Sequence, residues 1–128
     1  SHAAAISEGH PYPLLNALRL EAERTGHLDV ASHDELLAAA ESFRRGQMQT
    51  TPPTDAPWCF FDVAEIRAFH GDEAGFLTAL REGLNHVTAD YQPETFRRSL
   101  ESLSAAGVEL PGVAAAIQLL DEKIASLK

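Results

Sequence analysis

The chain of 128 residues is 45% hydrophobic and 23% charged, a balance that suits one globular domain with its own core. Its formal net charge of −9 disfavours nucleic acid and anionic membranes as partners, because phosphate groups are bound by basic patches. No apolar run reaches the roughly 18 residues of a membrane span, and the single Cys59 indicates a reducing, cytoplasmic compartment. We expect a flexible segment over residues 1–10 and one helical-repeat domain over residues 11–128.

Two helices are predicted in the N-terminal half, from apolar residues that recur three and four positions apart. The first helix ends at Gly26, and the second begins at Ser32 or His33 and ends at Gly46. Their apolar stripes are Leu14, Leu15, Leu18 and Ala22 in the first helix, and Leu36, Leu37, Ala40 and Phe43 in the second. Residues 47–57 have the composition of a loop.

The centre of the chain predicts a helical hairpin. Pro57 suits the first turn of a helix, and Gly71-Asp72 separates this helix from the next one. A tight turn needs a residue that tolerates positive φ, and an aspartate then caps the following helix. We expect the core around this turn to contain Trp58, Phe61, Phe69, Phe76 and Leu80. The small residues that let the two helices approach are Ala64, Ala68, Ala79 and Gly83.

Two further helices complete the prediction. The fifth opens at Pro93 and Glu94 and ends at Gly107, and the sixth starts at Pro111. Their inward residues are Phe96, Leu100 and Leu103 in the fifth helix, and Val113, Ile117, Leu120 and Ile124 in the sixth. No segment alternates with the period of a strand, so the predicted fold class is all-α, with about six helices in three antiparallel hairpins. The Gly-Asp turn between two amphipathic helices of about a dozen residues matches the tetratricopeptide pattern and predicts a right-handed helical repeat.

Several short motifs strengthen this interpretation by their order and spacing. The stretch Tyr12–Ala17 reads YPLLNA, which matches a Y-P-x-x-N-A opening. The later matching positions are Trp58, Glu65, Gly71-Asp72, Leu80, Glu94-Thr95, Leu100 and Leu103. Over about residues 11–106 the chain thus resembles the tetratricopeptide-like TRAFs-binding domain of apoptosis-signal-regulating kinases and its bacterial relatives.

This resemblance implies a helical-repeat sensor or scaffold, which in bacteria is often joined to a separate effector domain. We therefore expect a non-catalytic signalling module without a cofactor, which binds a protein partner or a fused effector through a helical-repeat surface. The alternative is a sensor of a small anionic, nucleotide-like ligand that regulates a fused effector. Self-association of the chain is a further option.

Five polar residues are candidates for binding this ligand or partner. Asn16 and Arg19 are three positions apart on one predicted helix, as are Thr95 and Arg98 on another, so each pair shares a helix face. Glu65 lies in the most apolar helix, where a carboxylate must be paired. We expect the three helices to bring these faces together in a polar groove, with Glu65 orienting an arginine. The alternative interpretation is purely structural, with Asn16 tying a neighbouring segment and Glu65 in an ion pair.

Catalytic and metal sites are not predicted. The six histidines form no HxxxH or ExxH pattern, and His70 stands at a helix C-terminus, where it is expected to cap the helix. Cys59 has apolar neighbours and is expected to be a core thiol rather than a nucleophile. The chain contains no G-x-S-x-G motif, P-loop or dinucleotide fingerprint.

Overall fold

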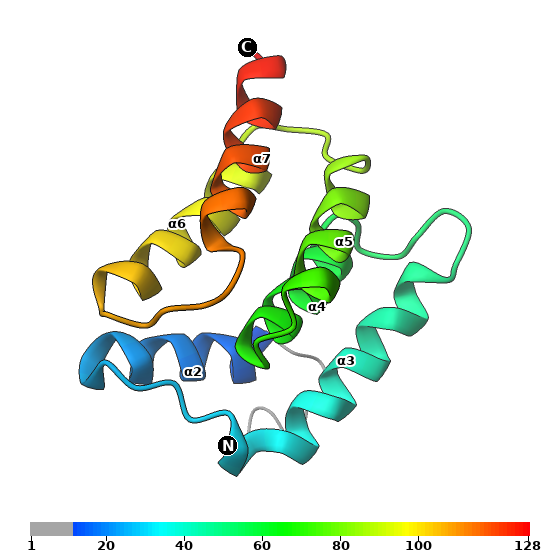
Figure 1. Cartoon of the computed structure of the whole chain (residues 1–128). Coiled ribbons are helices and arrows are strands. Elements are labelled where there is room, and N and C mark those ends of the chain that lie inside the picture. Colours follow the sequence, from blue (N-terminus) through cyan, green and yellow to red (C-terminus); the bar gives the residue numbers. More distant parts are fainter. Residues whose placement is uncertain (1–11) are drawn as a thin grey trace.

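The computed structural model describes residues 12–128, which form six α-helices and one short 3-10 helix and contain no β-strand (Figure 1). The predicted all-α class and number of helices are thereby confirmed for this part of the chain. The flexible segment expected over residues 1–10 lies outside the described residues. Within the described part, no helix is both long enough and apolar enough to cross a membrane.

The helices are, in chain order, α2 (Tyr12–Thr25), η1 (Ala31–His33), α3 (Asp34–Met48), α4 (Trp58–Phe69), α5 (Glu73–Leu84), α6 (Tyr91–Ala105) and α7 (Val113–Ser126). Gly26 and Gly107 follow α2 and α6 with φ angles of 75° and 88°, as expected of glycines that end helices. Gly46 does not end its helix, contrary to the prediction, because its φ is not positive and α3 continues through it to Met48.

A tight hairpin of α4 and α5 forms the centre of the fold. Gly71 adopts a φ of 75° between the two helices, and the Asp72 carboxylate accepts a hydrogen bond of 2.9 Å from the backbone N–H of Gly75. Gly83 lets the helices approach, because a β-carbon added there would lie only 2.7 Å from the β-carbon of Phe60. The turn and the close approach predicted for this hairpin are both present.

The other helices pack around this hairpin. Helix α3 lies along α4, and α7 lies against both α6 and α5, so that α6 and α7 form a second antiparallel pair (Figure 1). The first pair differs from the prediction, because α2 packs along α6 rather than along α3. Helices α2 and α3 instead meet in an apolar cluster that includes Leu15, Leu37 and Leu103. The linker 26–30 and η1 separate α2 from α3 and allow this arrangement.

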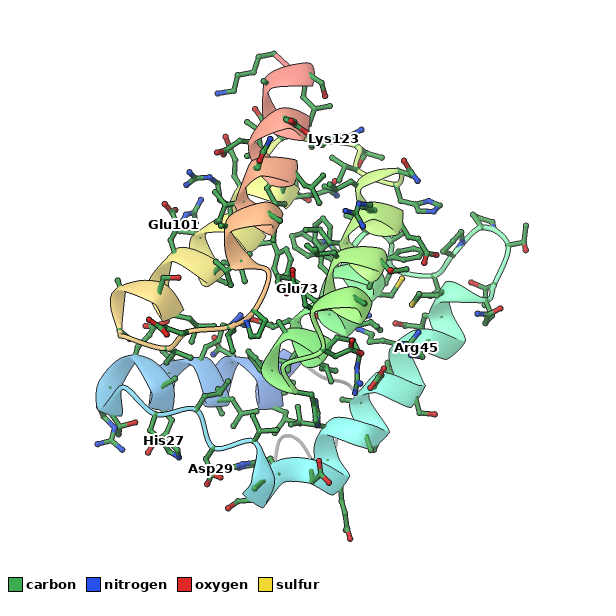
Figure 2. All side chains as sticks on the ribbon, viewed as in Figure 1. His27, Asp29, Arg45, Glu73, Glu101 and Lys123 are labelled. Carbon is green, nitrogen blue, oxygen red and sulfur yellow. The ribbon has the colours of Figure 1, made fainter. Side chains whose placement is uncertain are left out.

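The interior of the described chain is mostly apolar but also contains Arg44, Glu65 and Gln92. Other charged side chains, such as Arg45, Glu73 and Glu101, are exposed (Figure 2). Of the five core residues expected around the Gly71 turn, only Trp58 is not fully buried. On α3 the predicted stripe is partly wrong, since Leu36 and Phe43 are exposed. The buried face of α3 consists of Leu37, Ala40 and Arg44. The third residue on this face, at the i+7 position, is an arginine. The pattern of hydrophobic residues alone therefore did not reveal which face of α3 is buried.

Candidate functional site

Three helices that are distant in the sequence enclose one pocket of about 280 Å³, which we call the α2–α4–α6 pocket. It is lined by Asn16, Arg19, Glu23, Trp58, Phe61, Asp62, Glu65, Thr95, Phe96 and Ser99. Four of the five candidate residues, namely Asn16, Arg19, Glu65 and Thr95, therefore lie around one cavity. Their role in binding stays a prediction.

Helical periodicity explains why these side chains meet. On α2, Asn16, Arg19 and Glu23 follow the i, i+3, i+7 spacing of one helix face. On α4, Glu65 stands seven positions after Trp58 and so lies on the same face of that helix. The packing of α2 along α6 then closes the cavity between the three helices. This tertiary contact, which the predicted hairpin order did not include, assembles the site.

The structure does not bring Arg98 to the pocket, which corrects its place in the predicted groove. Arg98 is exposed and lies with Arg97 and Asp121 at a separate, shallow depression between α6 and α7. With about 100° between successive residues, Arg98 points roughly 200° away from the buried Phe96 and therefore faces solvent. The Nε of Arg97 donates to Asp121 Oδ1 at 2.6 Å, and Thr95 lines the other cavity, so Thr95 and the two arginines do not converge on one site.

A buried ion pair lies in the wall of the pocket. Glu65 is 3% exposed, and its Oε2 atom lies 3.5 Å from Nη1 of Arg19, the first of the arginines expected to pair with it. The same Arg19 nitrogen donates to Ser99 Oγ at 3.3 Å. Burial raises the pKa of Glu65 to about 7, and the nearby charge of Asp62 adds to this effect, although Arg19 opposes it.

This raised pKa predicts a specific pH dependence of stability. Between the unfolded value of 4.5 and the folded value of about 7, the folded chain binds more protons at Glu65 than the unfolded chain. The free energy of unfolding should therefore fall as the pH rises, by as much as about 3 kcal/mol from this group. The Glu65→Gln variant has no titrating group at this position. Urea unfolding at pH 4.5 and 7.5 should show that wild type loses more free energy of unfolding between the two pH values than this variant does. Equal losses in the two proteins would contradict the prediction.

Aromatic side chains form the apolar part of the pocket. The rings of Phe61 and Phe96 are stacked with centroids 5.1 Å apart, and Trp58 meets Phe61 edge to face at 5.8 Å. Tyr91, which is exposed, lies 6.3 Å from Trp58 between ring centroids. Ligand pockets are usually lined mainly by apolar side chains, whereas seven of the ten residues that line this one are polar or charged. The position of Trp58 in the pocket wall explains why it remains partly exposed, contrary to its predicted burial.

Sequence reasoning missed Arg44 and Asp62, which support this wall. Arg44 is 3% exposed, and its Nε and Nη2 atoms both contact Asp62 Oδ2, at 2.8 and 2.7 Å. Its Nη1 atom donates to Asp55 Oδ2 at 2.8 Å. Arg44 therefore ties α3, the loop before α4 and α4 together, and it fixes one carboxylate of the pocket. The sequence does contain one indication that Arg44 is buried. It stands seven residues after Leu37 and therefore lies on the same face of the helix.

The remaining titratable candidates have structural roles. Burial raises the pKa of the Cys59 thiol, which agrees with the predicted core thiol. The Nδ1 atom of His70 lies 2.9 Å from the carbonyl oxygen of Ile66, and its Nε2 atom lies 3.3 Å from Asp34 Oδ1, as suits a residue at a helix end. Within residues 12–128, no three His, Cys, Asp or Glu side chains are grouped so that they could hold a metal ion.

None of the protein-family models, curated proteins or solved structures with which we compared the chain matches it. The likeness to the TRAFs-binding domain therefore rests on the sequence motifs alone. The pocket offers a polar rim, an aromatic wall and a buried ion pair.

Proposed function

We propose that the chain is a non-catalytic interaction module that binds a segment of a partner protein in the α2–α4–α6 pocket. The observation that carries this proposal is the pocket itself, in which partly exposed Trp58 and the polar residues of three helices surround one cavity. A volume of about 280 Å³ lies just below the range of roughly 300–1,000 Å³ that is typical of ligand pockets. That size suits one or two side chains of a peptide better than a whole nucleotide.

The charges of the pocket also favour this proposal over an anionic ligand. Among residues 12–128, Arg19 is the single cation that lines the cavity, and both Glu65 and Ser99 already contact it. An enzymatic role is less well supported, because the described residues around the pocket include no hydroxyl or thiol hydrogen-bonded to a histidine or carboxylate base.

The tetratricopeptide-like arrangement and the family resemblance are part of the same proposal. The α4–α5 hairpin and the antiparallel α6–α7 pair support a repeat of helical hairpins. The packing of α2 along α6 is a departure from a regular stack. A fused effector domain remains a further proposal that follows from the resemblance, and a cytoplasmic location is one that follows from the single Cys59.

The test is a selection of random-sequence displayed peptides on the immobilised chain. Thr95 is exposed and lines the pocket, so Thr95→Trp should fill the cavity with little loss of stability. The matched control is Thr78→Trp, at an exposed position of α5 that is not among the pocket residues. We expect peptides that bind wild type and Thr78→Trp, and that bind Thr95→Trp at least about tenfold more weakly. If no selected peptide makes this distinction, the pocket is not the binding site.

A further inference from the structure

We infer that the α2–α4–α6 pocket is selective for a cation, namely the guanidinium or ammonium group of an arginine or lysine side chain in the partner segment. This inference rests on the proposed function and names the chemistry of its ligand. Three observations lead to it: the balance of charges around the cavity, an aromatic ring that lines the same cavity, and the size of the space.

Carboxylates outnumber cations around the cavity. In the described part of the chain, Glu23, Asp62 and Glu65 line it, and Arg19 is the single basic residue that does so. Asp62 and Glu65 each already contact one arginine, whereas Glu23 is exposed and has no ion pair with any residue from 12 to 128. An entering cation would gain Glu23 as a partner, whereas an entering anion would meet three carboxylates.

An aromatic surface lines the same cavity. Trp58 lines the same cavity as Glu23 and is only partly buried, with the exposed Tyr91 next to it. The faces of aromatic rings attract cations, and tryptophan does so most strongly. A carboxylate combined with a tryptophan is a pairing that recognises guanidinium and ammonium groups but gives no advantage to an acidic side chain.

The size of the cavity and the charge of the whole chain agree with this ligand. A single long side chain can enter a space of about 280 Å³ while its backbone stays at the surface. The net charge of −9 also attracts a basic segment over distances comparable with the Debye length.

The structure supplies its own reporter for the test, because Trp58 is the single tryptophan of the chain. Its fluorescence is followed while the chain is titrated with acetyl-Gly-Gly-Arg-Gly-Gly-amide at millimolar concentrations. The same peptide with lysine, citrulline or glutamate in place of arginine is titrated in parallel. Citrulline keeps the shape of arginine without its charge, so this comparison isolates the cation. We expect saturable changes with arginine and lysine, which weaken as salt is added, and no saturation with citrulline or glutamate.

Charge reversal at the rim is the second arm of the experiment. Glu23→Lys should weaken binding of the arginine peptide at least about tenfold. The matched control Glu82→Lys makes the same charge change at an exposed position of α5 outside the pocket and should change the affinity by less than about twofold. Thermal melts of both variants confirm that each one is folded.

The outcomes separate this inference from the proposed function. If arginine and citrulline peptides respond alike, or if neither peptide saturates, the cation inference is wrong. A stronger response to the glutamate peptide would overturn it in favour of an anionic ligand. In each of these cases the proposed function still stands if the peptide selection yields binders that Thr95→Trp excludes. If the selection also fails, both proposals are wrong.

Discussion

The Phe76→Ala variant is expected to lose about 3–5 kcal/mol of its free energy of unfolding. Phe76 is 0% exposed in the apolar cluster formed by α4, α5, α6 and α7. Its Cδ2 atom also lies against the backbone at Gly112, where an added β-carbon would be 3.4 Å away. Truncation would therefore leave a cavity at the point where the central hairpin meets the start of α7.

Urea unfolding followed by far-ultraviolet circular dichroism measures this loss. Leu20→Ala is the control, because Leu20 is 57% exposed and its truncation should cost less than about 1 kcal/mol. A loss below about 1 kcal/mol for Phe76→Ala would mean that α5 does not pack its phenylalanine face inward.

Arg44→Ala is expected to cost about 3 kcal/mol. The substitution strips Asp62 and Asp55 of the guanidinium that holds them. Removing one partner of a buried ion pair leaves an uncompensated charge, and the cost is at the lower end of the range because both aspartates keep some exposure. Asp62 would also lose its fixed position in the wall of the pocket.

The neighbouring arginine provides a matched control for this prediction. Arg45 pairs with Glu41 at 2.8 Å on the surface of α3, and its side chain is 49% exposed. Surface pairs of this kind contribute little, so Arg45→Ala should change the free energy of unfolding by less than about 1 kcal/mol. Equal losses in the two variants would show that Arg44 is not a buried cross-link.

The parts of the fold that depend on local chemistry could be predicted from the sequence. Gly71 and Asp72 determine a turn and a cap within a few residues, and the α4–α5 hairpin follows from them. The position of α2 could not be predicted in this way. Its apolar face fits any groove of suitable shape, and the choice of α6 over α3 depends on packing between elements that are distant in the sequence.

The candidate site was predictable to a similar extent. The buried carboxylate of Glu65 required a partner, and Arg19 was among the arginines considered. Arg98 does not line the pocket, because two residues three positions apart share a helix face only loosely, and Ser99 rather than Arg98 borders the buried face of α6. Glu23 and Trp58 were missed as site residues, since their place became apparent only from the packing of the three helices.

The most direct test of pocket binding is a map of backbone amide chemical shifts in the ¹⁵N-labelled chain as a selected peptide is added. The largest shifts are expected in three separate segments, residues 16–23, 58–65 and 95–99, because these segments carry the pocket side chains. The same peptide should leave the spectrum of Thr95→Trp nearly unchanged. Shifts confined to the outer face of α3, around the exposed Leu36 and Phe43, would contradict binding in the α2–α4–α6 pocket.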